Sequence, residues 1–214
     1  MQKIGIIGGT FNPIHFGHLI IANYFLTELE LYKCFFVPAW LSPFKTEDIS
    51  AKSISADHRV NMLRLAIEDN SCFDIDLYEI EKQGISYTYD TVQHFMSRFP
   101  KQEIHLLIGT DQAKSFTEWG NWQKILEHSN ICIAARPDSF SRDYKNEISK
   151  KLTVNDKKPC WLNTPLLEIS STSIRDRVSL KRSIKYLVPE NVREYIKVNQ
   201  LYAKSEKKLD LLSE

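Results

Sequence analysis

Short runs of apolar, often β-branched residues alternate along this chain with segments whose apolar residues recur at helical spacing. Buried strands of a parallel sheet read as such continuous runs, whereas a helix on the sheet shows one apolar stripe. Because parallel strands need a crossover connection, the alternation favours a parallel sheet with helices on both faces. The expected strands are residues 4–7, 35–37, 73–75, 104–108 and 131–135, with a weaker one at 160–162.

Helical patterns fill the stretches between these runs. The first covers residues 18–30, and the second runs to residue 68 after Ser55, a residue type that caps helices. Right-handed crossovers then give a Rossmann-like, doubly wound α/β fold in a single domain, which we assign to residues 1–200. We expect the charged residues 201–214 to form a frayed tail. Further helices are expected at 90–98, 123–128 and 144–150, and from Val188-Pro189-Glu190, where proline fits the first turn.

The charge balance limits the classes of partner. The chain has 214 residues, and 28 basic side chains nearly cancel 27 acidic ones, so there is no strong basic field for nucleic acid. No run approaches the roughly 20 apolar residues of a membrane-spanning helix, and the start lacks the apolar core of a signal peptide. We therefore expect a cytoplasmic protein with small-molecule partners and no nucleic-acid or membrane partner. The sequence does not define an oligomeric state.

The segment GGTFNPIHFGH, residues 8–18, joins the first strand to the first helix. Glycines let a backbone approach an anion closely, and a helix N-terminus presents unpaired N–H groups with a partial positive charge. Phosphate binding is one interpretation of Gly8 and Gly9, and a plain tight turn is the other. The spacing fits neither GxGxxG nor GxxxxGK[ST], which argues against a nicotinamide-dependent oxidoreductase.

The histidines favour the phosphate interpretation. His15 and His18 flank Gly17 where the loop meets the helix. A metal site needs further ligands, and no nearby cluster of Cys, His or Glu supplies them. A neutral imidazole still donates one hydrogen bond, so two rings can donate to phosphate oxygens. The alternative is a hydrogen-bonded pair with a structural role.

Two separated motifs resemble a known superfamily. GTFNPIHFGH resembles the (H/T)xGH signature of nucleotidyltransferases, and ISSTSIR, residues 169–175, is similar to their distal ISSTxIR motif. The resemblance is closest to the bacterial nicotinate-nucleotide adenylyltransferase family, through SYTYDT (86–91), LLIGTD (106–111), EWGNW (118–122), ARP (135–137) and the closing YLVPENVREYI. It implies transfer of AMP from ATP to nicotinate mononucleotide. The products are deamido-NAD, for NAD synthesis, and pyrophosphate, with Mg²⁺ carried by ATP.

The implied chemistry needs positive charge more than a base. A phosphate monoester has a second pKa of about 6, so the attacking group is already largely ionised at neutral pH. Catalysis then consists of positioning and neutralising two polyanions. The resemblance implies a catalytic set of His15, His18, Lys45 and Arg175. On the residues alone, Lys45 also suits an ordinary solvated lysine.

The resemblance also assigns the two substrates. The nicotinate carboxylate would bind N–H groups where a predicted helix follows Tyr87 and Thr88. Trp119 either stacks on the pyridine ring or packs in the core. The Ser/Thr run of the distal motif caps a helix, binds the triphosphate, or does both. The implied mononucleotide-binding residues are Asn12, Tyr87, Thr88 and Trp119. The implied ATP-binding residues are Gly8, Gly9, Thr10, Phe11, Gly109, Asp111, Arg136, Ile169, Ser170, Ser171 and Thr172.

The sequence departs from the family pattern at two places. It has SPFK where the family usually has PPHK, so Phe44 stands where a histidine is expected beside the mononucleotide phosphate. Phenylalanine donates no hydrogen bond, which places one phosphate contact in question. Asn12 replaces a commoner aspartate and removes a negative charge near phosphates. The alternatives are a sister enzyme that uses nicotinamide mononucleotide or phosphopantetheine, and a nucleotide-binding protein without turnover.

Overall fold

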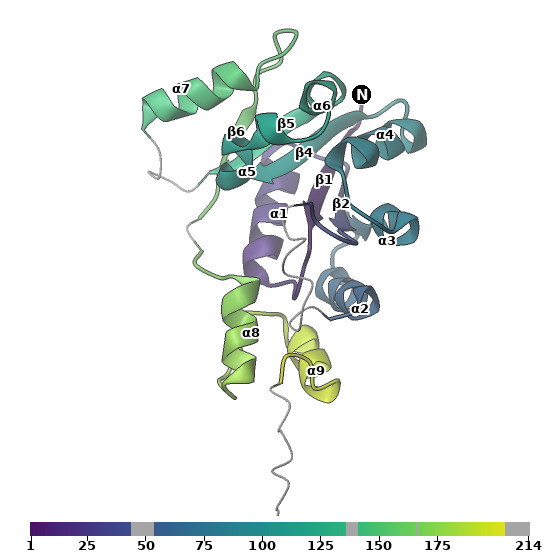
Figure 1. Ribbon diagram of the computed structural model, residues 1–214, viewed down its shortest axis with the longest axis vertical. Coiled ribbons are helices and arrows are strands. Elements are labelled where there is room, and N and C mark those ends of the chain that lie inside the picture. Colours follow the sequence, from purple (N-terminus) through teal and green to yellow (C-terminus); the bar gives the residue numbers. More distant parts are fainter. Residues whose placement is uncertain (44–53, 136–140, 166, 204–214) are drawn as a thin grey trace, which may run out of the picture.

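The computed structural model of the chain describes residues 1–43, 54–135, 141–165 and 167–203. Its centre is a six-stranded sheet in the order β3-β2-β1-β4-β5-β6, in which all neighbouring strands are parallel. Strand order proceeds outward from β1 to β3 on one side and from β4 to β6 on the other. The expected Rossmann-like, doubly wound fold is therefore confirmed, with its switch point between β1 and β4 (Figure 1).

Every predicted strand is present, and the two longest strands, β1 and β4, form the buried centre of the sheet. The strands are β1 (Lys3–Gly9), β2 (Lys33–Pro38), β3 (Phe73–Ile75), β4 (Glu103–Gly109), β5 (Asn130–Ala135) and β6 (Cys160–Asn163).

Most helices also lie at the predicted places. The short helices α3, α5 and η2 were not predicted, because one or two turns are too short to show an apolar stripe. The helices are α1 (Phe16–Glu28), α2 (Ala56–Ile67), α3 (Tyr78–Lys82), α4 (Thr88–Arg98), α5 (Thr110–Lys114), the 3₁₀ turn η2 (Phe116–Glu118), α6 (Trp122–His128), α7 (Arg142–Lys151), α8 (Ser171–Ser179) and α9 (Glu190–Val198).

Two helix starts show how local chemistry sets the ends. Ser55 caps α2 as predicted, since its hydroxyl accepts a hydrogen bond from the backbone N–H of His58. The third helix was expected from about Asp90 to Arg98, and α4 begins two residues earlier, at Thr88. The Asp90 carboxylate binds the ammonium of Lys82. Asp90 lies inside the first turn of α4, and the residue at the N-cap position is Tyr87.

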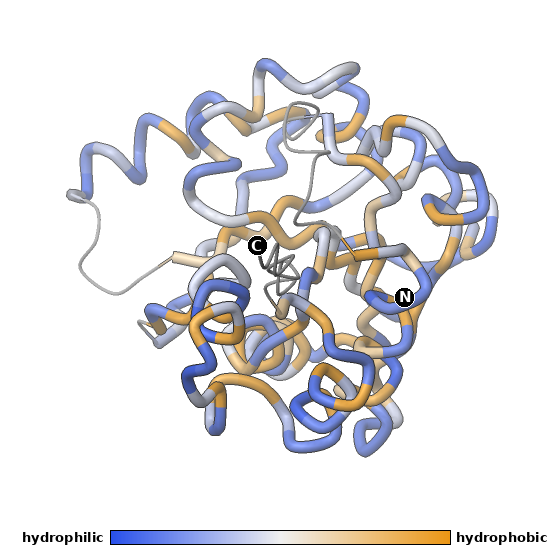
Figure 2. Tube along the Cα trace, turned by 60° about the horizontal axis from the view of Figure 1, so that its bottom comes forward, coloured by the Kyte–Doolittle hydropathy of each residue, from blue (hydrophilic) through white to orange (hydrophobic). Residues whose placement is uncertain are grey.

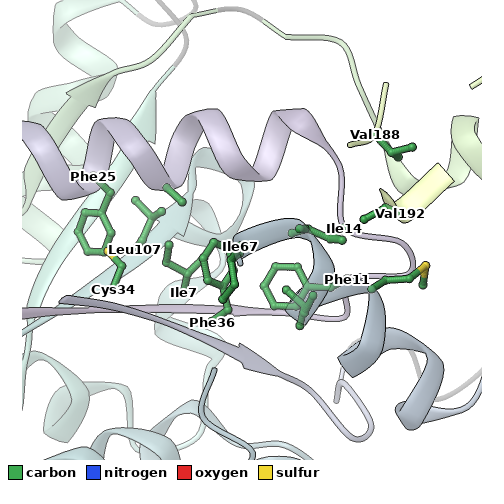
Figure 3. Packing of buried hydrophobic residues seen from close by; sticks show 14 of the residues in the cluster. Ile7, Phe11, Ile14, Phe25, Cys34, Phe36, Ile67, Leu107, Val188 and Val192 are labelled. Carbon is green, nitrogen blue, oxygen red and sulfur yellow. The ribbon is translucent and has the colours of Figure 1, made fainter. Parts of the chain in front are cut away.

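The helices cover both faces of the sheet. The first core packs α1, α2, α8 and α9 against one face, and the second core packs α4, α5, α6 and α7 against the other. Successive strand residues alternate between them: in β4, Leu106 belongs to the second core and Leu107 to the first. Hydrophobic segments run through the middle of the molecule (Figure 2). The first core extends from Phe25 on α1 to Val192 on α9 (Figure 3).

The C-terminal part of the described chain packs against this core. Leu201 is only 7% exposed and Tyr202 is half-buried, so the packed chain continues past the expected boundary at residue 200. Residues 204–214 lie outside the described residues. Within the described ranges, no helix has the length and apolar character needed to span a bilayer.

We expect Gly5→Ala to destabilise the protein. A Cβ at Gly5 would lie 2.6 Å from a ring carbon of Phe25 and 2.7 Å from both the Cys34 sulfur and a methyl group of Leu31. Overpacking of this kind costs about 1–3 kcal/mol in the free energy of unfolding. Urea denaturation followed by circular dichroism measures the change. Gly8→Ala is the matched control in the same strand, because its Cβ would meet nothing within 4 Å; equal stability of the two variants would contradict the prediction.

Candidate active site

The loop from β1 to α1 lies at the carboxyl edge of the sheet beside the switch point. Open parallel sheets bind ligands in the crevice at this place, because the crossovers on either side lead to opposite faces. The loop contains the cis peptide bond Asn12–Pro13, and Phe11 has a left-handed φ of 48°. Helix α1 begins at Phe16, with His15 as its N-cap residue, two residues before the start that the sequence predicted at His18. The loop and helix N-terminus thus meet as the sequence indicated.

The two histidines of the loop form a stacked pair. Their ring centroids are 3.7 Å apart with an interplanar angle of 24°. His15 is 5% exposed, and burial lowers its pKa to about 4. The ring is therefore neutral at pH 7 and donates a single N–H. A Cβ at Gly17 would lie 3.0 Å from Nδ1 of His15, so glycine here leaves room for that ring. The edge of the Phe11 ring supports His18, at a centroid distance of 5.2 Å.

The distal motif binds the same loop through α8. The Ser171 hydroxyl donates to the carbonyl of Pro13 at 2.8 Å, and Nη1 of Arg175 donates to the carbonyl of Asn12 at 2.9 Å. Nη2 of Arg175 also donates to the Thr172 hydroxyl at 3.2 Å. Residues more than 150 positions apart in sequence therefore form one structure. Figure 1 shows α8 at the end of the molecule where β1 leads to α1.

Within α8, the serine run does cap the helix. Ser170 is the N-cap residue, and its hydroxyl accepts from the backbone N–H of Ser173 at 3.1 Å. Thr172 is exposed, whereas Ile169 packs against the first core. Capping by Ser170 uses only the N–H of Ser173. The other N–H groups in the first turn of α8 remain available to an anion.

The SYTYDT segment places a helix N-terminus next to an aromatic turn. Tyr87 is the N-cap residue of α4 and 45% exposed, and within the described residues no side chain caps this helix. The turn after η2 adjoins it, because a Cβ on Gly120 would lie 4.0 Å from Cδ1 of Tyr87. Trp119, in this turn, is half-buried and tilted against Phe116 at a centroid distance of 4.9 Å. The structure thus brings the turn that contains Trp119 next to Tyr87 and the start of α4.

The end of β4 leads directly into a short helix. Gly109 is the N-cap residue of α5, and its N–H donates to Oε1 of Gln112 at 2.8 Å. Asp111 lies in the first turn of α5, two residues after β4 ends, because the chain turns helical directly after Gly109. The Asp111 side chain is 95% exposed and 3.6 Å from the ammonium of Lys114.

Three residues named from the sequence fall outside the described ranges. These are Lys45 and Phe44 on the loop after β2, and Arg136 after β5. The described part of the first loop runs beside the SYTYDT segment, since the N–H of Ser86 donates to the carbonyl of Leu41 at 2.9 Å.

Sequence reasoning missed two residues that bind the loop. Nη1 of Arg59 on α2 donates to the carbonyl of Thr10 at 2.8 Å, and the Tyr202 hydroxyl donates to Oδ1 of Asn12 at 2.7 Å. A signal for Arg59 was present, because Arg59 and Leu63 are four residues apart and share the buried face of the helix. A charged residue on an apolar face needs a polar partner. Tyr202 gave no such signal, since it follows the last helix.

A doubly wound sheet with the two motifs joined beside its switch point is the arrangement expected of a nucleotidyltransferase. The family model for cytidylyltransferase-like proteins matches residues 6–177. The chain belongs to the nicotinate-nucleotide adenylyltransferase branch of this family, as the segments from SYTYDT to the closing YLVPENVREYI indicated. Two curated relatives carry the name probable nicotinate-nucleotide adenylyltransferase. The one from Dictyoglomus thermophilum is 39% identical over 94% of this chain and 100% of its own length, and the one from Dictyoglomus turgidum is 37% identical over 97% and 98%.

Solved structures agree on the fold. A Plasmodium falciparum nicotinic acid mononucleotide adenylyltransferase complexed with NaAD matches with a TM-score of 0.72 at 20% identity, covering 94% of this chain and 98% of that one. The same enzyme complexed with APC matches with a TM-score of 0.71 at 19% identity over the same shares. At this identity, the agreement concerns the arrangement of strands and helices.

Proposed function

We propose that this chain transfers the adenylyl group of ATP to nicotinate mononucleotide, giving nicotinate adenine dinucleotide for NAD synthesis. The observation that carries the proposal is the binding of Ser171 and Arg175 to the backbone of the first motif. A phosphate oxygen of the mononucleotide forms a bond to the α-phosphorus of ATP. The bond from that phosphorus to the bridging oxygen breaks, and its electron pair leaves with pyrophosphate.

The proposed chemistry needs hydrogen-bond donors at the phosphates and no catalytic base. The attacking phosphate has a second pKa of about 6 and is largely ionised before it binds. The barrier arises from bringing two polyanions into line, which positioning and charge neutralisation lower. His15 is neutral and contributes one N–H, and His18 stacks on it at the helix N-terminus. Lys45 and Arg136 are proposed to contact phosphate and adenine respectively.

The proposed Mg²⁺ would arrive with ATP. In the described part of the chain, no three His, Cys, Asp or Glu side chains gather into a metal cage. Mg²⁺ commonly keeps several waters and binds mainly through substrate phosphates, so the residues present fit an ion held by the triphosphate. When bound, the ion would neutralise charge on the phosphates. Gly8, Gly9 and the N-terminus of α8 would then face the remaining phosphate oxygens.

The start of α4 is the proposed site for the nicotinate carboxylate. Its first N–H groups have no side-chain cap among the described residues, and the positive end of the helix dipole favours an anion. Trp119, beside Tyr87 and Thr88, supplies an aromatic face for the pyridine ring. A nicotinamide would present its NH₂ to these donors and leave them unpaired. Sites of this kind discriminate strongly against the mismatched analogue.

An assay of pyrophosphate release tests the function directly. Purified protein with ATP and Mg²⁺ should turn over nicotinate mononucleotide, with a kcat/KM at least about 100-fold above that for nicotinamide mononucleotide. Phosphopantetheine should give no release. Absence of turnover with either mononucleotide, together with tight ATP binding, would overturn the enzyme assignment and favour a nucleotide-binding protein. Preference for the amide would overturn only the assignment of the acid.

We further propose a cytoplasmic location and ATP and nicotinate mononucleotide as the partners, with no nucleic-acid or membrane partner. All four cysteines are free thiols, which supports a reducing compartment.

A further inference from the structure

A buried arginine outside both motifs touches the phosphate loop. Arg59 is 3% exposed, and among the described residues no carboxylate lies within ion-pair distance of it. Burying an unpaired guanidinium is costly unless its N–H groups find acceptors. Its acceptor is the carbonyl of Thr10, at 2.8 Å from Nη1. The packing of α2 therefore holds the Arg59 guanidinium, a hydrogen-bond donor, against the backbone of the first motif.

A tyrosine from the other end of the chain touches the next part of the same loop. The Tyr202 hydroxyl donates to Oδ1 of Asn12 at 2.7 Å. Burial raises the pKa of Tyr202, although the guanidinium groups of Arg175 and Arg59 oppose the rise. The phenol therefore remains protonated at neutral pH and stays a donor. With Oδ1 occupied, Asn12 is left with its NH₂ group for other partners.

Helix α9, which precedes Tyr202, is hydrogen-bonded to α2. On α9, the Tyr195 hydroxyl is 3.0 Å from Nδ1 of His58 and accepts from Nδ2 of Asn61 at 3.1 Å, and both partners are on α2. Figure 1 shows α9 beside α2 below the end of β1. Arg59, on α2, and Tyr202, four residues after the end of α9, therefore approach the loop from two helices that are hydrogen-bonded to each other.

Because of the geometry of the peptide bond, these contacts fix the directions of two hydrogen-bond donors on the loop. In a trans peptide, the carbonyl of one residue and the N–H of the next point in opposite directions. When Arg59 holds the Thr10 carbonyl toward α2, the N–H of Phe11 faces away from α2. Among the described residues, no backbone carbonyl accepts a hydrogen bond from that N–H. The Phe11 N–H and the Asn12 NH₂ are thus two donors whose directions are set from behind the loop.

We propose that Arg59 and Tyr202 are positioning residues, which hold the Phe11 N–H and the Asn12 amide toward the phosphates of the substrates. The inference rests on the proposed function, since it takes the loop as the phosphate site. Neither residue touches the reacting atoms, and each acts through one named group of the loop.

A double-mutant cycle tests the role of Tyr202. Tyr202→Phe should lower kcat/KM about tenfold, the effect of losing one orienting hydrogen bond. If Tyr202 acts through Asn12, the same change in an Asn12→Ala background should lower kcat/KM less than about twofold. An equal loss in both backgrounds, or no loss in the single variant, would overturn the role of Tyr202.

Tyr195→Phe is the matched control for the cycle. It removes a hydroxyl from the same C-terminal segment without touching the loop, so it should lower the melting temperature and leave kcat/KM unchanged. A loss of kcat/KM as large as that of Tyr202→Phe would show that loosening α9 suffices, and would overturn the proposal.

The role of Arg59 is tested with Arg59→Lys, which keeps the charge but lacks the planar fork. We expect the ATP dissociation constant, measured by calorimetry without acceptor, to rise about threefold to tenfold. Wild-type affinity would exclude Arg59. Because calorimetry needs no turnover, the cycle on Tyr202 can be repeated on ATP binding. If the enzyme assignment fails, the wild-type protein releases no pyrophosphate. If the positioning roles fail, the variants bind ATP with the affinity of the wild type.

Discussion

Replacing His18 by alanine should lower kcat/KM by about 100-fold or more, with little change in stability. The ring stands at the N-terminus of α1, stacked on the neutral His15 and supported by Phe11. A donor held this way strengthens its hydrogen bond as charge develops on the transferring phosphoryl group, and removal of such a donor costs about 10²–10³-fold. Steady-state pyrophosphate release measures the change, with circular dichroism to confirm the fold.

A control and a second variant distinguish the loss of the His18 hydrogen-bond donor from the loss of the packing of its ring. His128→Ala removes a histidine at the end of α6, outside the site, and should leave kcat/KM unchanged. His18→Gln keeps an N–H donor and should recover part of the rate. If His18→Ala retained wild-type kcat/KM, the ring would belong to the structural pair that the sequence left as an alternative.

Arg175→Lys should lower kcat/KM about 100-fold although it keeps the positive charge. The guanidinium fork holds two oxygens at once, the carbonyl of Asn12 and the hydroxyl of Thr172. An ammonium is a point charge without that planar geometry, so the substituted lysine could not contact the loop and the Thr172 hydroxyl at once. Of the described hydrogen bonds, only that of Ser171 would still join the loop to the first turn of α8. The rate loss should appear mainly in kcat, because alignment of the two substrates suffers more than charge attraction. Separate determination of kcat and KM for ATP checks this.

Arg177→Lys provides the matched control two residues further along α8. Its guanidinium donates to the carbonyl of Ser183, away from the loop. The control should retain the wild-type kcat/KM. Equal activity of the two lysine variants would remove Arg175 from the catalytic set.

The sheet was predictable because its signal is local. The run KIGII is apolar on both faces, and β1 pairs on both sides with parallel strands. Helix ends were less predictable. Asp90 has the character of a cap, yet it binds Lys82 from α3, a helix too short to be recognised by its pattern. A capping residue and a salt-bridge residue look alike until the partner is known.

The candidate site was predictable in its parts and not in its assembly. The first motif showed a histidine pair, and the distal motif showed a helix cap followed by Arg175. The bonds of Ser171 and Arg175 to the loop depend on where α8 packs. Arg59 and Tyr202 could not be assigned at all, because their partners are single atoms of a loop far away in sequence. The roles of the site residues in binding and catalysis stay predictions.

The sequence by itself determined the alternating strands and helices, the doubly wound class and the family, because apolar periodicity and contiguous motifs are properties of neighbouring residues. Only the tertiary structure decided that α2, α8 and Tyr202, four residues after the end of α9, together bind the loop between Gly9 and His15. The physical reason is that a hydrogen bond between distant segments depends on how whole helices pack, and packing is set by both cores at once.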